Sequence, residues 1–302
     1  MNARAGQSGS LFLGIDGGGS KCKVVLLDAN GQLLAEGLGG PANPLRGMKV
    51  ATDSIITATQ QALTAAGLGL GEMARLTVGA GLAGVNMPQY FQAMQQWQHP
   101  FAEFYLTTDL HVACIGAHQG QDGAVIIAGT GSCGLASVQG QVLELGGHGF
   151  PYGDNGSGAW FGNQLVHHVL LHHDELGPAT LLSELLAEQL GTTETLAIVA
   201  HFMHATPTIF AKYAPLVFVA AEQGDVVAQE IVRIGAQHIE QMAMRLFSLN
   251  PPRLAMIGGL AYKIVPHLNE CVRARIVDAA TAPEYGAVWF ARQQRQTLNL
   301  VK

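Results

Sequence analysis

The sequence predicts an α/β protein built from two tandem domains, and three observations carry this prediction. An opening unit of three short strands is followed by alternating helical and strand patterns. The same unit of strand, glycine-rich turn and strand begins again at Gly123. The 302 residues suffice for two domains of ordinary size, each with its own core. A supersecondary unit that occurs twice indicates a duplicated domain.

The first domain is expected over residues 11–118, after a disordered lead-in over residues 1–10. An apolar strand over 11–15 reaches Asp16 and three glycines, the chain resumes as a second strand over 24–27, and a third strand follows Gly31. The remaining expected elements are an irregular loop over 39–44, helices over 47–67, 90–97 and 110–118, and strands over 76–80 and 104–108.

The second domain is expected over residues 119–302. It repeats the opening design, with a strand that reaches a glycine-rich turn over 129–134, a strand over 135–138 and a third strand that ends at Gly146 and Gly147. The C-terminal helix, over 285–302, could pack back on the first domain. The other expected elements are helices over 160–173, 179–189, 194–203, 211–222 and 226–249, and a strand over 254–257.

Composition excludes several classes of partner. The formal net charge is −6, and lysine and arginine are scattered without a basic run, which argues against nucleic acid or an anionic membrane. No apolar stretch has the length of a membrane span, and the first ten residues lack the apolar region of a signal peptide. The four cysteines lie far apart and indicate free thiols of a reducing cytoplasm: Cys22, Cys114, Cys133 and Cys271.

Asp16 and the glycines after it carry the strongest functional signal. A glycine turn between strands can present its backbone amides to an anion, because no Cβ blocks the approach. Asp16 supplies a hard oxygen ligand of the kind that Mg²⁺ prefers, directly or through a water. The turn therefore predicts a site for a metal-bound nucleotide phosphate. A plain tight hairpin is the alternative.

Two better-known phosphate motifs are nearly matched and fail. Gly14 and Gly19 have the spacing of a Walker A loop, but Ser20-Lys21 follows in the wrong order. The glycines over 129–134 fit the dinucleotide fingerprint GxGxxG. In both places a strand follows where these motifs require a helix, so neither a P-loop nor a Rossmann site is expected.

The motifs together resemble a known superfamily. The turns Asp16-Gly-Gly-Gly-Ser20 and Gly129-Thr-Gly-Ser132, with the late Ile257-Gly-Gly-Leu260, resemble those of the sugar kinase/Hsp70/actin superfamily. That superfamily has two ribonuclease H-like (actin-like ATPase) domains with a cleft between them. The resemblance covers nearly the whole chain from Leu11 onward.

One segment makes the resemblance more specific. Residues 146–162 resemble a segment of the BadF/BadG/BcrA/BcrD ATPase family, and more closely its N-acetylglucosamine kinase and glucosamine kinase members. His148 stands where tryptophan is usual, and Asn155 where glutamate is usual. Both positions adjoin the family's sugar pocket, so these departures bear on the choice of sugar.

The resemblance implies ATP and Mg²⁺ as cofactors and a role for Asp109. Asp109 is the base that accepts the proton of the attacking sugar hydroxyl. The alternative is a helix N-cap, because aspartate is favoured there. The resemblance also assigns residues to the nucleotide, with Asp16 near Mg²⁺. They are Gly17, Gly18, Gly19, Ser20, Thr130 and Gly131 at the phosphates, Lys21 as a point charge, and Gly258 and Gly259 beside the adenosine.

Each nucleotide assignment has a plainer alternative. Lys21 could be an exposed, solvated lysine, and Gly258 and Gly259 could form an ordinary turn. On the sugar side the resemblance implies contacts from Asn43, Ser132, Gly146, Gly147 and Asp154. Asn43 precedes a proline, which is also a common turn arrangement. A histidine pair at i, i+4, His168 and His172, lacks any metal motif and indicates a polar helix face.

The leading functional hypothesis is an ATP-dependent amino-sugar kinase that phosphorylates the 6-hydroxyl of N-acetylglucosamine, with glucosamine as the nearest rival substrate. An alternative of another class is an ATPase activator of a 2-hydroxyacyl-CoA dehydratase, which would hold an iron–sulfur cluster through paired cysteines; no two cysteines here are close in sequence. A sugar sensor without activity is a third hypothesis, against which Asp109 argues. A homodimer is expected from the resemblance alone.

Overall fold

The computed structural model describes residues 10–300, with side chains through residue 298. The predicted disordered lead-in lies, apart from Ser10, outside the described residues. The chain divides into two compact units. Of the described residues, 10–121 and 279–300 form one unit, and 122–278 form the other.

The first unit is built on a five-stranded sheet in the order β3-β2-β1-β4-β5. Strands β1, β2 and β3 form an antiparallel meander, whereas β4 and β5 continue the sheet in parallel with β1. The carboxyl ends of β1, β4 and β5 therefore meet at one edge. The strands are β1 (Leu11–Gly17), β2 (Cys22–Leu27), β3 (Leu33–Gly39), β4 (Leu76–Leu82) and β5 (Glu103–Thr108).

The second unit repeats this topology, with the order β10-β9-β6-β7-β8. Strands β6, β7 and β8 form the meander, and β9 and β10 run parallel to β6. The duplicated meander that the sequence predicts is therefore confirmed. The strands are β6 (Gly123–Ala128), β7 (Ser132–Val138), β8 (Gln141–Gly146), β9 (Leu254–Ile257) and β10 (Ile276–Val277).

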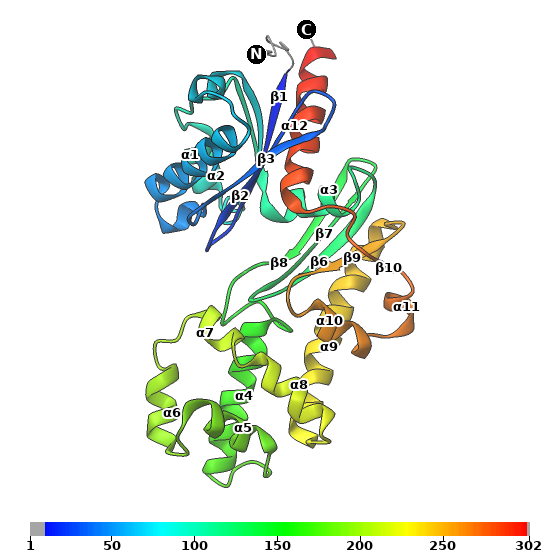
Figure 1. Ribbon diagram of the computed structural model, residues 1–302. Helices are drawn as coiled ribbons and strands as arrows, with labels where there is room; N and C mark the ends of the chain where they lie inside the picture. Colours follow the sequence, from blue (N-terminus) through cyan, green and yellow to red (C-terminus); the bar gives the residue numbers. More distant parts are fainter. Residues whose placement is uncertain (1–9, 301–302) are drawn as a thin grey trace. The chain divides into compact units, whose positions relative to one another are not determined.

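Helices cover both faces of the first sheet. Figure 1 shows this sheet between α1 on one side and α12 on the other. Helix α12 contacts β1, β4 and α3, so the two chain segments of this unit pack together. The helices are α1 (Met48–Ala65), α2 (Pro88–Gln95), α3 (Asp109–Ala117) and α12 (Pro283–Leu300), with short 3₁₀ turns η1 (Pro44–Arg46) and η2 (Leu70–Arg75).

Glycines allow α12 to lie directly on the sheet. A Cβ at Gly14 of β1 would collide with the backbone oxygen of Glu284, and one at Gly79 of β4 with the backbone oxygen of Ala287. Both glycines face the first turns of α12. The absence of side chains at these two positions places the beginning of α12 within contact of the central strand.

The second unit is mostly helical beyond its meander. The predicted helix over 211–222 is broken, because Pro215 stands in the first turn of α8 and α7 ends before it. The segment over 260–275, for which no element was predicted, contains three short helices. The elements are α4 (Gly158–His173), α5 (Leu181–Leu190), α6 (Thr195–Phe202), α7 (Pro207–Ala211), α8 (Ala214–Glu222), α9 (Val226–Leu246), η3 (Phe247–Leu249), α10 (Ala261–Ile264), η4 (Val265–His267) and α11 (Glu270–Arg273).

Among residues 10–300, no helix combines the length and the apolar character needed to cross a bilayer.

The contact between α12 and the sheet can be tested at Gly79. We expect Gly79→Ala to lower the free energy of unfolding by about 1–3 kcal/mol, because the new methyl group overlaps a backbone carbonyl that cannot rotate away. Urea unfolding measures the change. Gly71→Ala is the matched control, since nothing lies within 4 Å of that position, and it should change stability by less than about 0.5 kcal/mol. Equal effects of the two substitutions would contradict the packing described.

Candidate active site

Asp16 lies at the carboxyl end of the central strand β1. It pairs with Lys23 across the antiparallel β1/β2 ladder and with Gly81 across the parallel β1/β4 ladder. Asp16 shares its face of the sheet with Gly14, because side chains two residues apart in a strand point the same way. Its carboxylate therefore projects on the α12 side of the sheet, at the edge where three parallel strands end.

The predicted phosphate turn connects β1 to β2. The Gly18 amide donates to the Lys21 carbonyl at 2.9 Å, which closes the turn. Gly17 packs against Leu82 without room for a Cβ, whereas nothing lies within 4 Å of the Cβ direction of Gly19. Within the described chain, the amides of Gly19 and Ser20 have no hydrogen-bond partner. The segment is thus a tight hairpin turn, as the alternative stated, and the amides of Gly19 and Ser20 in it can still donate to an anion.

Burial and neighbouring carboxylates both raise the pKa of Asp16. Burial, with the charges of Asp109 and Glu284, raises the pKa of Asp16 to about 7, although Lys21 and Lys23 act to lower it. An aspartate held in this way favours any added positive charge beside it. This donor set fits Mg²⁺, which binds proteins through one or two carboxylates and takes its other ligands from phosphates and water.

Asp109 begins α3 directly after β5. The N-cap of this helix is Thr108, whose hydroxyl accepts from the His111 amide at 3.1 Å. The N-cap alternative for Asp109 is therefore wrong. Its carboxylate is half-buried and accepts only from neighbouring backbone, including the Leu110 amide at 2.9 Å. Burial raises the pKa of Asp109, and the amides of Leu110 and Asp109 itself oppose the shift.

Asn43 follows the loop after β3 and lies beside the end of β4. Its side-chain oxygen accepts from the Leu45 amide at 2.9 Å and caps η1, so the turn role is real. Gly84, with a φ of +84°, packs against this side chain and has no room for a Cβ. The Asn43 NH₂ group is left available for another acceptor. Asn43, Asp16 and Asp109 thus all belong to the first unit.

An ion pair that sequence reasoning missed lies next to Asp16. Lys23 Nζ is 2.7 Å from the Glu284 carboxylate, which is 1% exposed, and 3.6 Å from that of the more exposed Glu36. Glu284 stands in the first turn of α12. The pairing of Lys23 with Asp16 could be inferred from a hairpin register, but no local pattern indicates a partner 261 residues away in sequence.

The second glycine turn lies between β6 and β7 and is attached to the beginning of α4. The Gly158 amide donates to Gly129 O at 2.8 Å, and the Ala159 amide to Thr130 O at 3.1 Å. Gly131, within this turn, packs against the carboxylate of Asp154, and a Cβ there would lie 2.9 Å from the Asp154 oxygen. The turn therefore lies at a helix N-terminus, where the helix dipole favours an anion, while the first two amides of α4 are bound to the carbonyls of the turn.

Gly258 and Gly259 follow β9, the parallel neighbour of β6. Gly258 has a φ of +104° and packs on the backbone of Ala128, and the Leu260 amide donates to Ala128 O at 2.9 Å. The turn alternative is thus correct for Gly258. Gly259 has open space in its Cβ direction. Because Ala128 ends β6, this turn lies beside the turn over 129–131.

A hollow of about 310 Å³ gathers three of the predicted sugar contacts: Ser132, Gly146 and Asp154 line it, with the two departures His148 and Asn155. Asp154 adopts a φ of +60°, which costs an ordinary residue conformational energy. Burial raises the pKa of Asp154, while hydrogen bonds from the amides of Ser132 and Gly149, and His148, lower it.

Hydrogen bonds of Ser132 and Gly147 hold the loops around this hollow. Ser132 is 2% exposed, and its hydroxyl donates to the Asn155 carbonyl at 2.8 Å, so it fixes the loop that carries Asp154. The Gly147 amide donates to the Ser132 carbonyl at 3.1 Å. Gly146 and Gly147 both have positive φ values, at +75° and +67°. The predicted residues therefore form two groups, one in each unit.

Other candidates lie elsewhere. Lys21 is exposed. On α4, His173 shares a hydrogen bond of 3.0 Å with Thr195, and within residues 10–300 no cluster of three metal-ligating side chains was found.

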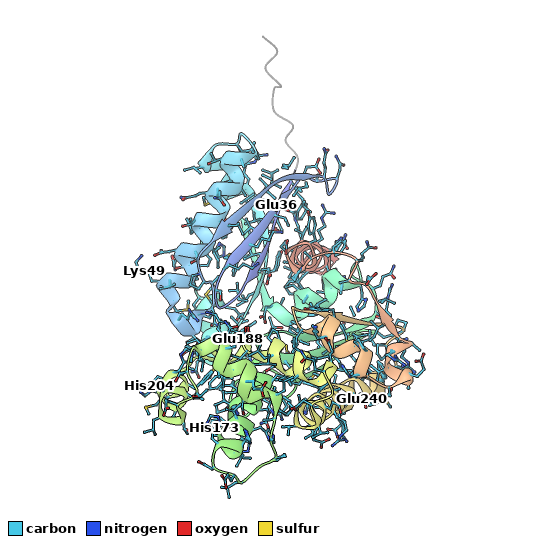
Figure 2. All side chains as sticks on the ribbon, turned by 60° about the horizontal axis from the view of Figure 1, so that its bottom comes forward. Glu36, Lys49, His173, Glu188, His204 and Glu240 are labelled. Carbon is cyan, nitrogen blue, oxygen red and sulfur yellow. The ribbon has the colours of Figure 1, made fainter. Side chains whose placement is uncertain are left out.

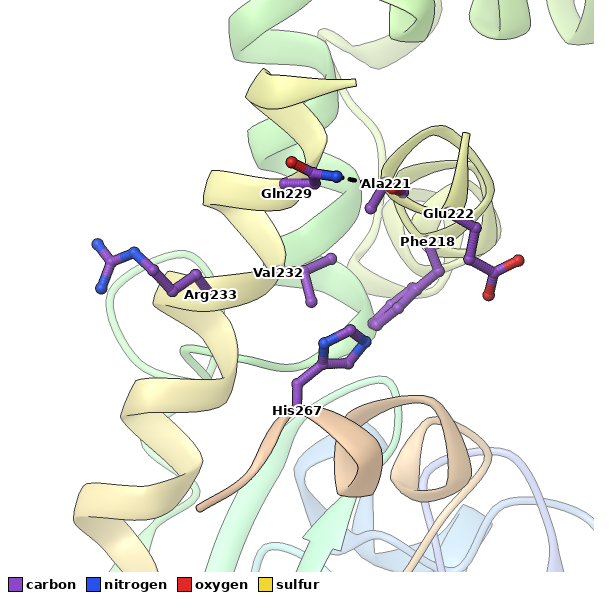
Figure 3. Close-up of a pocket in the computed structure, with 7 residues that line it drawn as sticks. All are labelled: Phe218, Ala221, Glu222, Gln229, Val232, Arg233 and His267. Atoms are coloured by element: carbon purple, nitrogen blue, oxygen red, sulfur yellow. Dashed lines mark hydrogen bonds between the residues drawn. The ribbon is translucent and has the colours of Figure 1, made fainter. Parts of the chain in front are cut away.

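A hollow of about 340 Å³ between α8, α9 and η4 contains none of the predicted site residues. Figure 3 shows Phe218 and His267 facing one another there, with Arg233 turned away.

Comparison with known proteins identifies relatives along the whole chain. The sequence model of the BadF/BadG/BcrA/BcrD ATPase family matches residues 13–291. A glucosamine kinase of Vibrio cholerae is 34% identical over 95% of this chain and 97% of its own. An N-acetyl-D-glucosamine kinase of Dictyostelium discoideum is 29% identical over 96% of this chain and 100% of its own.

A solved structure confirms the fold. A protein of Chromobacterium violaceum, proposed to be an N-acetylglucosamine kinase, superposes with a TM-score of 0.86 at 29% identity, over 93% of this chain and 99% of its own. The predicted pair of actin-like ATPase domains is therefore confirmed.

The ion pair beside Asp16 yields a stability test. We expect Lys23→Met to lower the free energy of unfolding by about 3–5 kcal/mol, because it leaves the buried Glu284 carboxylate without a counter-charge. The double variant Lys23→Met/Glu284→Gln should recover much of that loss. Thermal and urea unfolding provide the measurement.

Lys49→Met is the matched control for that test. Lys49 pairs with Asp53 at 2.6 Å, but its side chain is 87% exposed, and Figure 2 shows it projecting outward from α1. An exposed pair contributes at most about 1 kcal/mol. A loss at Lys23 no larger than that at Lys49 would contradict a buried, structurally required pair.

The raised pKa of Asp16 makes stability depend on pH. The folded state binds a proton at Asp16 up to a pH of about 7, whereas the unfolded state releases it near 3.8. The free energy of unfolding should therefore fall as pH rises from about 4 to 7. Asp16→Asn should remove this dependence and raise stability at pH 8 by about 4 kcal/mol. Parallel pH profiles for the wild type and the variant would exclude this account.

Proposed function

The chain belongs to the BadF/BadG/BcrA/BcrD ATPase family, and we propose that it is an ATP-dependent kinase that transfers the γ-phosphoryl group to the 6-hydroxyl of N-acetylglucosamine. One structural observation supports the proposal in addition to the similarity to known sugar kinases. The Asp109 carboxylate, relieved of the capping role by Thr108, lies at the same strand edge as the open turn beside Asp16.

Asp109 acts as the base in the proposed reaction. The sugar oxygen forms a bond to the γ-phosphorus as the bond from that phosphorus to the β,γ-bridging oxygen breaks, and the hydroxyl proton passes to Asp109. The products are the sugar 6-phosphate and ADP. Burial raises the pKa of Asp109 and so makes its carboxylate a better proton acceptor than an exposed aspartate. Orientation of the hydroxyl matters more than basicity, because the transition state of phosphoryl transfer is loose.

The two glycine turns bind the phosphates in this proposal. The open amides of Gly19 and Ser20 suit an anion, and the turn at Thr130 and Gly131 adds the positive end of α4. Asp16 would hold Mg²⁺, because a cation beside it offsets the repulsion from the Asp109 and Glu284 carboxylates. When bound, Mg²⁺ neutralises charge on the transferred phosphoryl group. In this proposal Gly258 and Gly259 contact the adenosine.

In this proposal Asn43 and Asp154 contact the sugar. Asn43 offers its NH₂ group, and Asp154 offers a carboxylate that two backbone amides already orient. A carboxylate that accepts two hydroxyl protons rejects analogues without those hydroxyls, because its buried oxygens would be left unpaired. The 34% identical glucosamine kinase favours glucosamine as the second candidate substrate.

Nothing in the described chain favours the dehydratase-activator alternative. Such an activator holds its cluster through paired cysteines, whereas Cys22 and Cys114 are buried, and the two more accessible cysteines, Cys133 and Cys271, lie on the separate elements β7 and α11. The homodimer and the cytoplasmic location stay predictions that accompany the proposed function.

Replacing the proposed base tests the mechanism. We expect Asp109→Asn to lower kcat for phosphorylation of N-acetylglucosamine by about 10²–10⁴-fold while ATP still binds, because the amide cannot accept the hydroxyl proton. Release of ADP measures the rate, and phosphorus NMR of the product identifies the 6-phosphate.

The pH profile of the same reaction provides a second readout. Activity of the wild type should fall as pH drops through the raised pKa of Asp109, since only the carboxylate is active. Asp53→Asn, at an exposed carboxylate on α1, is the control and should leave kcat unchanged. Full activity of Asp109→Asn in a folded protein would refute the assignment.

A further inference from the structure

Helix α9 forms a wall of the hollow that contains Asp154. His238, Gln241 and Met242 line this hollow opposite the predicted sugar contacts. None of them belongs to a recognisable motif, and they lie more than 80 residues beyond Asp154 in the sequence. The described structure therefore adds side chains to the proposed sugar site that sequence patterns do not indicate.

A second hollow, of about 330 Å³, adjoins the first. Asn155, His238 and Gln241 line both hollows, so these three side chains stand between them. The second hollow is completed by Trp160 from α4 and by Ile234 and Gln237 from α9. It therefore combines amide groups with apolar surface.

The side chains between the two hollows have unused hydrogen-bonding capacity. Among the described residues, none forms a hydrogen bond with the side chains of His238, Gln241 or Asn155. Burial lowers the pKa of His238, so its imidazole is neutral at pH 7 and has one donor and one acceptor nitrogen. Gln241 is exposed and His238 and Asn155 are half-buried, so a ligand here would replace hydrogen bonds that these side chains otherwise make to water.

The charges of the two hollows differ. Asp154 is the only carboxylate among the described residues that line them, and it faces the first hollow alone. Ile234, Gln237 and Gln241 are exposed, so the second hollow is open to solvent, and an ammonium group placed in it would gain no counter-charge. An acylamino group instead offers one N–H donor, one carbonyl acceptor and an apolar methyl group. These match neutral amide or imidazole side chains and the surfaces of Trp160 and Ile234.

We propose that the second hollow receives the acylamino substituent of the sugar, and that His238 and Gln241 determine specificity by hydrogen-bonding its amide. This inference rests on the proposed kinase function and deepens it. Asn155, which stands where the family usually has glutamate, keeps the passage between the hollows free of a second carboxylate. The chain is accordingly specific for N-acylated amino sugars over free amino sugars.

The experiment compares kcat/KM for N-acetylglucosamine and for glucosamine in the full-length protein. The wild type should favour the acylated sugar. Gln241→Ala and His238→Ala should each lower kcat/KM for N-acetylglucosamine about 3- to 10-fold, the value of one neutral hydrogen bond, and leave glucosamine within about twofold. Gln241→Glu should move the preference toward glucosamine, because its carboxylate pairs with the ammonium group.

Met244→Ala is the matched control, since Met244 lies on α9, is 50% exposed and lines neither hollow. Thermal unfolding confirms that each variant is folded. A wild type that phosphorylates both sugars but prefers glucosamine would overturn the inference and leave the kinase function intact. Equal losses for the two sugars in the alanine variants would also overturn it. A wild type that phosphorylates neither sugar would overturn the proposed function itself.

Discussion

The first unit depends on how it holds several carboxylates together at one edge of its sheet. Asp16 and Asp109 end two strands that run parallel, and Glu284 approaches the same edge from the beginning of α12. Burial, with repulsion from Asp109 and Glu284, raises the pKa of Asp16 to about 7. The arrangement is unfavourable in the free protein and becomes favourable when a cation enters. A site of this kind favours a metal-bound phosphate, because the metal cation removes the electrostatic repulsion between carboxylates that folding has brought together.

The rest of the unit makes this arrangement possible. Glycines at positions 14 and 79 let α12 lie on the sheet, which brings Glu284 close enough to pair with Lys23. That pair partly offsets the charge of Glu284, which still raises the pKa of Asp16. The hairpin register places Lys23 opposite Asp16. The same lysine therefore pairs with Glu284 and acts to lower the pKa of Asp16.

Much of this could be predicted from the sequence because its signals are local. Glycine turns after apolar strands indicate phosphate sites at short range, and the repeated meander predicts the shared strand order of the two sheets. Contacts between distant segments leave no such pattern. Glu284, His238 and Gln241 reach their positions only through packing of α12 and α9. Capping rules alone also could not decide between Thr108 and Asp109, because either residue suits an N-cap.

Direct titration of Asp16 tests the central claim. Carbon NMR of protein labelled at the aspartate side-chain carboxyls follows each group through its own protonation, and Asp16→Asn assigns the resonance. The account expects Asp16 to titrate near pH 7, to titrate at lower pH in Asp109→Asn, and to lose its titration near neutrality when Mg²⁺ and ADP are bound. An Asp16 that titrates near the ordinary aspartate value of about 3.9, unaffected by Asp109→Asn, would contradict it.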